Sequence, residues 1–549
     1  MNKVLTDVLV VGCGASGVAA AIQSARLGVK TIAIESTPWH GGMITSAGVS
    51  AFDGNKYALG GGIFGELRKK IEDYYGGADK TFTGWISLTC FEPHKGKEFL
   101  EDLIKAEENL EVWYNTKLIS VLSSFQRISG VICEREGEKI RIEAKITIEA
   151  TEFGDVLYLG AVPHLFGRES KRESGENSAP GEADFLIQDM TFCAILKKNL
   201  DVKMPTVTPS ENFDPSKFIN SVAEDSDTTD EEFLNHKLHN FESFITYSML
   251  PNDKYLLNWP FRANDYPTTI DIYTEIDERE KHFRKAKELT LDYIYYMQTI
   301  LGHPEWVLAD DEFGTEDELP FMPYVRESRR GVGLYYMVED DVIPVLNSNR
   351  PKLRFDSIAV GDYFLDHHHS HAFLPPGERL VEKYPDNAPF QISKDCLIPF
   401  KHKGLIFAEK SISVTHIVNG CTRLQPVVML LGQAAGALAA LAVINETEPA
   451  EVDLFELQEV LLVEGCQLFP YKDLYNTDPG FYKIQKLAIA GFYRDNAEFL
   501  FEPDAPVNSE EVNSLFNKLI EAGHSVSIDS LTAVNNRELY TKIYDLLFK

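Results

Sequence analysis

A glycine turn near the start of the chain has the residue types and the spacing that bind the phosphates of a dinucleotide. Its glycines are Gly12, Gly14 and Gly17, and Glu35 follows Gly17 by 18 residues. Gly12 permits a tight turn, Gly14 lets the backbone approach a pyrophosphate, and Gly17 lets a helix pack closely on a strand. Free N–H groups at the start of that helix attract the phosphates. Glu35 is then placed to bind the ribose hydroxyls.

The surrounding elements are the ones that must position this turn. Residues 8–11 are a continuous apolar run, which is typical of a parallel strand covered on both faces. Residues 18–27 predict an alanine-rich helix, and residues 30–34 predict a second strand that ends at Glu35. The alternative, a glycine-rich turn without a ligand, is disfavoured by this complete βαβ context. An acid rather than a base at position 35 also disfavours NADP.

Further segments indicate FAD rather than NAD as the ligand. Residues 40–43 contain two adjacent glycines, which allow a second close approach of the backbone to a dinucleotide. Residues 146–155 look like the strand and turn found late in an FAD domain. Residues 404–409 and 423–436 look like a strand and a helix from the C-terminal side of such a domain. The positive N-terminus of that helix can face the isoalloxazine ring and stabilise the reduced flavin.

On these motifs the chain resembles the FAD-dependent oxidoreductases of the glutathione-reductase-like superfamily. They are loosely akin to the fumarate-reductase flavoproteins, and some are called xanthan lyase-like. The resemblance implies FAD as the cofactor and an α/β fold. A Rossmann-like FAD-binding domain in two parts, residues 1–160 and 395–450, would carry an inserted α+β substrate domain at residues 161–394. The candidate FAD-binding residues are Gly12, Gly14, Ala15, Ser16, Gly17, Glu35, Ser36, Gly41, Gly42, Met43, Ala150, Thr151, Gly154, Asp155, Gln425 and Pro426.

A local basic cluster at residues 326–330 supplies the first candidate catalytic residues. Arginine stays protonated at any working pH and can bind a carboxylate or polarise a carbonyl. The same stretch resembles a motif of the family, which implies that Arg326 or Arg329 faces the flavin or the substrate. The alternative is ordinary ion pairing with nearby acids, which is common and weakly stabilising.

The second candidate is a histidine-rich segment with His367, His368, His369 and His371. Imidazole is the commonest transition-metal ligand, but structural zinc sites usually pair their ligands across two elements. We therefore predict no metal. The family resemblance instead aligns Asp366 and His368 with an Asp-x-His motif near the active site, which implies proton transfer beside the flavin. A metal site and a polar surface loop remain the alternatives.

These features predict an enzyme that transfers hydride between a small organic substrate and N5 of FAD. Oxidation of the substrate needs a base, for which His368 is the candidate, and reduction needs an acid, for which Arg326 or Arg329 is the candidate. No second dinucleotide motif is found, so the electron donor or acceptor stays unknown. The alternative function is a carbohydrate-binding or lyase-type protein in which the flavin is structural.

Composition excludes several classes of partner. The formal net charge is −31, and we find no basic stripe of the kind that nucleic-acid binding needs. Seven cysteines without a CxxC pair, and no secretion signal, predict a reducing, cytoplasmic location. Residues 427–444 are apolar enough to resemble a membrane span, but their many small residues favour a helix buried against a sheet or cofactor.

Residues 451–549 change pattern and predict a small helical module. Their order of helix, turn, Phe-x-Pro-x-x-Pro-Val and helix resembles a single S-layer-homology repeat. The basic stretch expected after Pro506 and Val507 is replaced by residues 508–511, which are polar and acidic. We therefore expect this module to pack on the FAD-binding domain or at a contact within a homo-oligomer, rather than to bind a cell wall.

Overall fold

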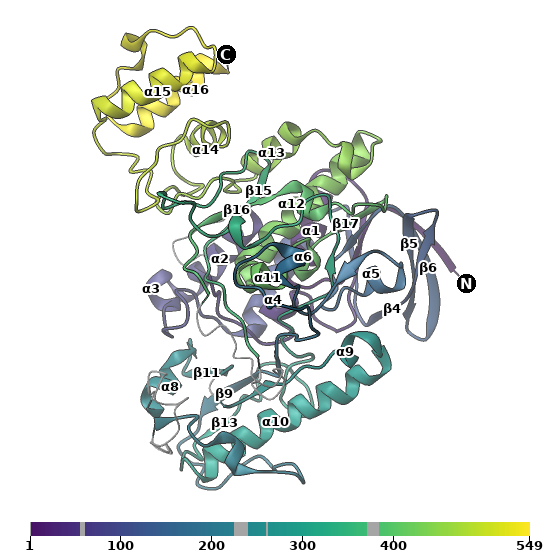
Figure 1. The fold of residues 1–549 in the computed structure, drawn as a ribbon. Coiled ribbons are helices and arrows are strands. Elements are labelled where there is room, and N and C mark those ends of the chain that lie inside the picture. The colour runs from purple at the N-terminus through teal and green to yellow at the C-terminus, as the bar shows by residue number, and fades with distance from the viewer. Residues whose placement is uncertain (1, 55–60, 224–239, 260–261, 370–383, 549) are drawn as a thin grey trace.

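The computed structural model describes residues 2–54, 61–223, 240–259, 262–369 and 384–548. Its central layer is a seven-stranded sheet in which β3, β2, β1, β6, β5 and β4 follow one another, and β17 also pairs with β6 (Figure 1). The strands are β1 (Asn2–Val11), β2 (Thr31–Ile34), β3 (Leu110–Trp113), β4 (Thr116–Ser124), β5 (Arg127–Arg135), β6 (Glu138–Glu149) and β17 (Leu405–Phe407).

The parallel part of this sheet is built around β1. Strand β1 pairs in parallel with β2 and with β6, and β2 pairs in parallel with β3. Strand β17 joins the carboxyl half of β6, with Ile406 opposite Ile148. A segment after residue 400 thus completes a sheet that begins at residue 2. The predicted α/β class with a Rossmann-like sheet is confirmed by this topology.

Helices α1 (Ala15–Arg26) and α12 (Gln425–Ile444) pack against each other beside this sheet. A Cβ on Gly432 would lie 2.0 Å from the carbonyl oxygen of Ser16, and one on Gly436 would lie 2.3 Å from that of Ala20. Only glycine permits so close an approach. By length and apolar character α12 could cross a membrane, yet 89% of its most apolar window is buried inside the protein.

A second layer lies below the sheet in the orientation of Figure 1. Its antiparallel sheet has the order β10 (Met249–Leu250), β11 (Lys254–Leu257), β9 (Ala194–Lys198) and β13 (Trp306–Leu308). Helices α8 (Phe241–Tyr247), α9 (Asp271–Thr274) and α10 (Arg279–Thr299) accompany it. Aromatic residues such as Trp259 and Tyr293 form a hydrophobic core separate from the main one. This layer occupies the segment in which we predicted the substrate domain.

The remaining elements are short and mostly connect these layers. They are α2 (Gly62–Tyr75), α3 (Ala78–Thr81), α4 (Pro93–Lys105), α5 (Asp155–Leu159), α6 (Lys171–Ser174), α11 (His416–Thr422), β7 (His164–Leu165), β8 (Met190–Thr191), β12 (Asp265–Tyr266), β14 (Arg330–Gly331), β15 (Ser357–Gly361) and β16 (Phe390–Ser393). Two short 3-10 helices matter below, η1 (Gly42–Ile44) and η8 (Glu409–Ser411).

The C-terminal part is helical, with α13 (Leu454–Val463), α14 (Phe481–Ile489), α15 (Ser509–Glu521) and α16 (Asn536–Leu547). Helix α13 contacts α12 and β15, whereas α15 and α16 stand apart from the sheet in Figure 1. The rings of Phe501 and Tyr540 pack edge to face with centroids 5.0 Å apart, where α16 meets the loop between α14 and α15. The likeness to an S-layer-homology repeat stays a prediction.

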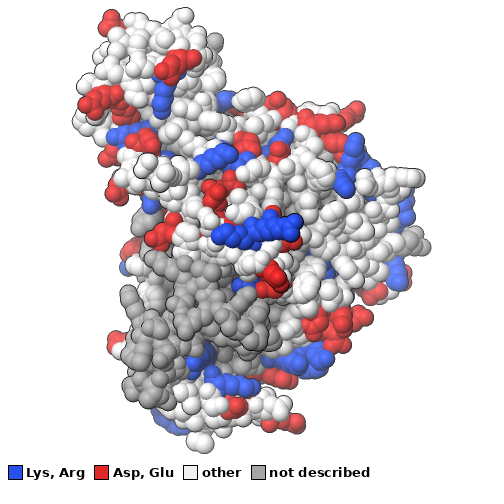
Figure 2. Space-filling model, in the orientation of Figure 1, with Lys and Arg blue, Asp and Glu red and all other residues white. Residues whose placement is uncertain are grey.

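The surface carries both signs of charge. On the face shown in Figure 2, acidic and basic side chains are interspersed over the described residues and form no continuous basic stripe there. Because the net charge is −31, the whole molecule repels polyanions in solution.

Candidate functional site

The glycine turn has the geometry that the sequence predicts for a dinucleotide-binding loop. Gly12 has φ 91°, and a Cβ there would lie 2.3 Å from the carbonyl oxygen of Ala150. A Cβ on Gly17 would lie 2.0 Å from the carbonyl oxygen of Gly12, so helix and strand are in direct contact. Ala15 and Ser16 form the buried first turn of α1. Their backbone N–H groups point away from the helix body, where an anion binds.

Glu35 lies at the end of β2 and is tied to the same turn. Its carboxylate accepts hydrogen bonds from the N–H of Cys13 and the N–H of Thr37, both at 2.9 Å. The hydroxyl of Ser36 donates to it as well, at 3.3 Å. Burial raises the pKa of Glu35 above 4.5 despite these hydrogen bonds. The acid is therefore held beside the loop, where the ribose of a dinucleotide would lie.

A second glycine turn rests on the first. Gly41 has φ 95° and donates its N–H to the carbonyl oxygen of Cys13 at 2.8 Å. A Cβ on Gly42 would lie 2.7 Å from Cα of Gly14, and Met43 is buried behind it. The two predicted glycine motifs thus form one continuous wall.

The turn after β6 is held by buried polar groups. Thr151 donates its hydroxyl to Glu149 at 2.6 Å, and burial raises the pKa of Glu149 to about 8. Gly154 has φ 68° and a Cβ there would lie 2.8 Å from Cβ of Arg329. Asp155 is bound by Arg279 at 2.6 and 2.7 Å, so its carboxylate is engaged within the protein.

Gln425 and Pro426 begin α12, as proline in the first turn of a helix favours. The side chain of Gln425 accepts the N–H of Asp53 at 3.2 Å and donates to the carbonyl oxygen of Ala51 at 3.0 Å. These hydrogen bonds fix the segment that follows η1 against the N-terminus of α12. The helix end that we predict to face the flavin is therefore joined to the segment that follows the second glycine turn.

The residues of these turns fit FAD. The carboxylate of Glu409 occupies the position at the start of α1 where a phosphate would bind. The N–H of Ser16 donates to Oε2 of Glu409 at 2.9 Å, so the start of α1 binds a negative group. Glycines without room for a side chain, an acid at the end of β2 and an oriented helix end complete the set. In this arrangement Ser16 and Gly42 would hold the pyrophosphate and Glu35 the ribose.

Arg326 and His368, predicted from separate segments, come together around one carboxylate. Asp265 lies 2.6 Å from Nδ1 of His368 and 3.0 Å from the guanidinium of Arg326. Nε2 of His368 lies 3.3 Å from Asp366, which also binds Arg423 at 2.7 Å. Two acids and two arginines therefore surround one imidazole.

The electrostatics of this cluster favour a charged imidazole. Burial and the charge of Arg326 act to lower the pKa of His368, but Asp366 and Asp265 outweigh them and raise it above 6.5. Burial raises the pKa of both acids, yet the charge of His368 and of the arginines holds each below 3.8. The two carboxylates therefore stabilise the protonated form of the His368 ring.

Arg329 lies outside this cluster. Its guanidinium donates to the carbonyl oxygen of Phe153 at 2.6 Å and to Asp155 at 3.1 Å, and it also binds the carbonyl oxygen of Tyr273. Arg326 and Arg329 thus face different parts of the protein, although the sequence presents them as one motif.

His367 and His369, the other histidines of the segment that the structure describes, contact His416. The rings of His367 and His369 stack on His416 with centroids 5.0 and 5.1 Å apart. His416 in turn contacts Glu327 at 3.1 Å. His371 lies outside the described residues.

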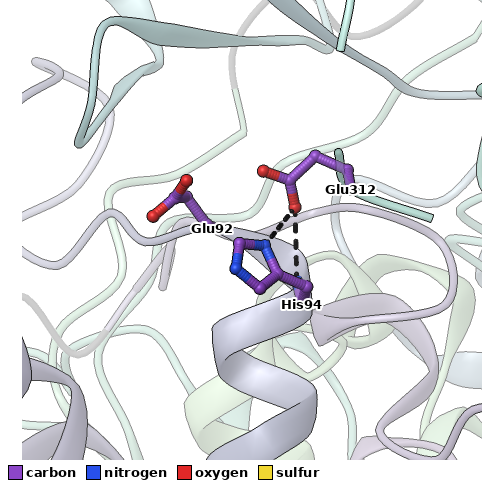
Figure 3. Close-up of side chains that lie close together, drawn as sticks. All are labelled: Glu92, His94 and Glu312. Carbon is purple, nitrogen blue, oxygen red and sulfur yellow. Dashed lines mark hydrogen bonds and ion pairs between the residues drawn. The ribbon is translucent and has the colours of Figure 1, made fainter. Parts of the chain in front are cut away.

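One acidic group with metal-ligand spacing holds a lysine. Glu92, His94 and Glu312 converge, and Figure 3 shows Glu312 hydrogen-bonded to His94. The ammonium of Lys254 lies 2.8 Å from Glu92 and 2.5 Å from Glu312. The cation that balances these acids is therefore a side chain.

Several residues of the site escaped sequence reasoning. Asp265 follows no recognisable motif, and nothing in its spacing marks it as the partner of His368. Glu409 and Lys410 follow β17 after one alanine, and an acid and a base near the carboxyl end of a parallel strand were a usable signal. Glu152 binds Lys410 at 2.5 Å from the turn after β6.

The glycine wall, the acid after β2 and the buried polar cluster together define a dinucleotide-binding flavoprotein. The family model of FAD dependent oxidoreductases matches residues 7–461. The chain belongs to this family, and its cofactor is FAD. Comparison with curated proteins found no match.

Three solved structures give the scale of the wider likeness. A geranylgeranyl bacteriochlorophyll reductase-like protein from Thermoplasma acidophilum is 11% identical, with a TM-score of 0.33 and 100% of both chains covered. Mycobacterium smegmatis Sdh1 in complex with UQ1 is 12% identical, with a TM-score of 0.34, 100% of this chain and 85% of that chain. E. coli quinol fumarate reductase FrdA is 13% identical, with a TM-score of 0.29 and coverage of 99% and 87%. The family assignment rests on the family model.

Proposed function

We propose that this oxidoreductase transfers a hydride between a small organic substrate and N5 of FAD, with His368 handling the accompanying proton. When bound, FAD supplies the two-electron centre. The observation that carries the proposal is the chain of contacts from Asp265 through His368 and Asp366 to Arg423. Arg423 stands two residues before Gln425, where α12 begins. A proton-carrying group is thus joined to the helix end expected to face the flavin.

The two ring nitrogens of His368 have different roles in this proposal. Nδ1 is held by Asp265 at 2.6 Å, which fixes the orientation of the ring. Among the described residues Nε2 has only the longer contact of 3.3 Å, to Asp366, and the side chain is 18% exposed. The proton on Nε2 is therefore the one that can move to a substrate. Asp366 and Asp265 raise the pKa of His368 above 6.5, which favours the protonated ring and suits reduction of the substrate.

The arginines support a substrate with oxygen acceptors, such as a carboxylate. The Nε–H groups of Arg326 and Arg423 are buried and donate to no acceptor among the described residues. Buried donors without a partner are costly, so a ligand or water with acceptor atoms is favoured there. Both arginines also hold the carboxylates that flank His368, which makes them positioning residues as well.

The free cysteines support a reducing, cytoplasmic location as part of the same proposal. All seven are buried and unpaired. Burial raises the pKa of Cys13, as it does for Cys193, to values that keep the thiols uncharged and unreactive.

The test is a spectrum followed through a single turnover. FAD-loaded protein, reduced anaerobically, is mixed with unsaturated or carbonyl-bearing carboxylates, and flavin absorbance is followed with time. We expect at least one compound to restore the oxidised spectrum stoichiometrically, and His368→Gln to slow that step without loss of flavin. Cleavage of a polysaccharide with an unchanged flavin spectrum would instead support the lyase-type alternative.

A further inference from the structure

Glu409 holds the donor that a dinucleotide phosphate needs. Its Oε2 accepts the N–H of Ser16 at 2.9 Å, at the start of α1. In return the hydroxyl of Ser16 accepts the N–H of Glu409 at 3.0 Å. A Cβ built on Gly14 would lie 3.5 Å from the same carboxylate oxygen. The glutamate thus occupies the space directly over the glycine turn.

A buried network keeps the Glu409 carboxylate in this position. Lys410 lies 2.7 Å from Oε1 of Glu409 and 2.5 Å from Oε2 of Glu152, and the side chains of Glu409 and Lys410 are fully buried. Oε1 of Glu152 has no hydrogen-bond partner among the described residues and lies 3.2 Å from the Cβ position of Gly14. Two carboxylates therefore face the loop with a single ammonium between them.

The backbone at Glu409 is also unusual for a residue with a side chain. Its φ is 53°, in the left-handed region that favours glycine. Holding glutamate there costs free energy that its surroundings must offset. The two hydrogen bonds to Ser16 and the ion pair with Lys410 are the interactions that do so.

A pyrophosphate and this carboxylate cannot use the same N–H group. Both are anions, and close like charges in a buried site repel strongly. We propose that Glu409 is an internal competitor for the FAD pyrophosphate, and that FAD binds only when the carboxylate swings off Ser16. Lys410 stays on Glu152 when this happens, and its ammonium becomes available to the phosphates. This inference rests on the proposed flavin-dependent function.

The consequence is a weakened, reversible hold on the cofactor. Part of the binding free energy of FAD goes into breaking the contacts of Glu409 with Ser16 and Lys410. Glu409→Gln removes the charge and keeps the size, and Glu409→Gly also relieves the backbone at φ 53°. Since a hydrogen bond to a charged group is worth about tenfold to a hundredfold in an equilibrium constant, we expect each variant to bind FAD tighter by about that factor.

The experiment measures the Kd of FAD for the full-length, cofactor-stripped chain by equilibrium dialysis. Glu312→Gln is the matched control, because it removes one acid from another buried lysine–diglutamate group, that of Lys254. Thermal unfolding is the second readout. Without FAD both Glu409 variants should have lower melting temperatures than the wild type, since Lys410 loses a partner. Added FAD should raise the melting temperatures of the variants by more than it raises that of the wild type.

The outcomes separate this inference from the proposed function. Tighter FAD binding by either Glu409 variant, with Glu312→Gln unchanged, supports the competitor role. Equal Kd values for the wild type and a folded Glu409 variant overturn that role and leave the use of FAD intact. If the wild type and both variants all fail to retain FAD, the flavin-dependent function itself is overturned.

Discussion

Nδ1 of His368 lies 2.6 Å from the carboxylate of Asp265, and this contact joins the histidine-rich segment to the substrate layer. Asp265 is itself fixed by Arg326 at 3.0 Å and by the hydroxyl of Thr191. Because these contacts fix the carboxylate of Asp265, its position determines the orientation of the His368 ring. Asp265 therefore sets the orientation of Nε2, the atom that carries the transferred proton in the proposed function.

Removing the charge of Asp265 should slow turnover and move its pH dependence. In Asp265→Asn one of the two carboxylates that raise the pKa of His368 is lost, so that pKa falls. If protonated His368 is the proton donor, the alkaline limb of the kcat profile then moves to lower pH. We expect kcat at neutral pH to fall by about tenfold to a hundredfold, less than the roughly 10²–10⁴-fold effect of losing a general acid entirely, because His368 is still present.

The control for this prediction is a second aspartate–histidine pair. Asp271 lies 2.9 Å from Nε2 of His282, and among the described residues it forms no ion pair with His368 or Arg326. Asp271→Asn should leave the kcat profile where it is, and the Kd of FAD should stay unchanged in both variants. An Asp265→Asn profile that superimposes on the wild type would remove His368 from proton transfer.

Arg326 and Arg329 should give opposite kinds of defect. Arg326→Lys keeps the charge but loses the fork that bridges Asp265, Thr191 and the carbonyl oxygen of Asp189, so we expect lower kcat and retained FAD. Arg329→Ala leaves Asp155 with Arg279 as its remaining arginine partner. It also removes the hydrogen bonds from Arg329 to the carbonyl oxygens of Phe153 and Tyr273. Breaking such a buried pair costs about 3–5 kcal/mol.

Urea unfolding and turnover per bound flavin distinguish these two defects. Arg329→Ala should lower the unfolding midpoint while the folded fraction keeps near-normal turnover. Arg326→Lys should lower turnover per bound flavin while the unfolding midpoint stays near that of the wild type. If Arg329→Ala abolishes turnover at full stability, Arg329 acts in catalysis, as its sequence motif suggests.

The contrast between these arginines shows where sequence reasoning stops. Residues 325–329 have no helical structure, and in an extended segment side chains three positions apart point to opposite faces. The spacing of the motif therefore hid the separation of Arg326 from Arg329. The glycine turn was predictable because its residues are neighbours in the chain, each with a local steric reason. Asp265 is 103 residues from His368, and only the folded chain brings them together.

The same locality explains the cofactor loop. Gly12, Gly17 and Glu35 belong to one βαβ unit whose order fixes their positions. The contact of Ser16 with Glu409 spans 393 residues and depends on β17 joining β6. No pattern in the sequence states that an acid after β17 reaches the start of α1.

Stability should depend on pH through the His368 cluster. The pKa of His368 is raised on folding, so its contribution is complete below 6.5 and is lost as pH rises through the raised value. The pKa values of Asp265 and Asp366 are lowered on folding, so their contribution is complete above 3.8 and is lost as pH falls. The cluster therefore stabilises most between these limits.

The difference between two melting curves isolates this effect. Burial also raises the pKa of Glu149 from 4.5 to about 8, so this group too lowers stability as the pH rises between those two values. We expect the melting temperature of the wild type minus that of His368→Gln to shrink as pH rises beyond 6.5. A difference that is constant from acid to alkaline pH would show that folding does not raise the pKa of His368.

The C-terminal region should tolerate truncation at residue 507 but not at residue 450. Helix α13 buries Leu457 and Leu461, and Gln458 donates to the carbonyl oxygens of Phe355 and Ser357 at 2.7 and 3.0 Å. A chain that ends at residue 450 loses these contacts and exposes part of α12. Each buried leucine is worth about 1.5–3 kcal/mol, so we expect aggregation or a much lower melting temperature.

A chain that ends at residue 507 is the matched control, because it keeps α13 and α14 and loses α15, the 3-10 helix η10 (Ile528–Leu531) and α16. It should remain soluble and bind FAD like the full chain, since the glycine turn, Glu35 and α12 lie outside the deleted helices. Size-exclusion chromatography and thermal unfolding of both truncations measure the difference. If the chain ending at residue 450 stays soluble with an unchanged melting temperature, α13 is dispensable to the FAD-binding fold, and its packing on α12 and β15 contributes little.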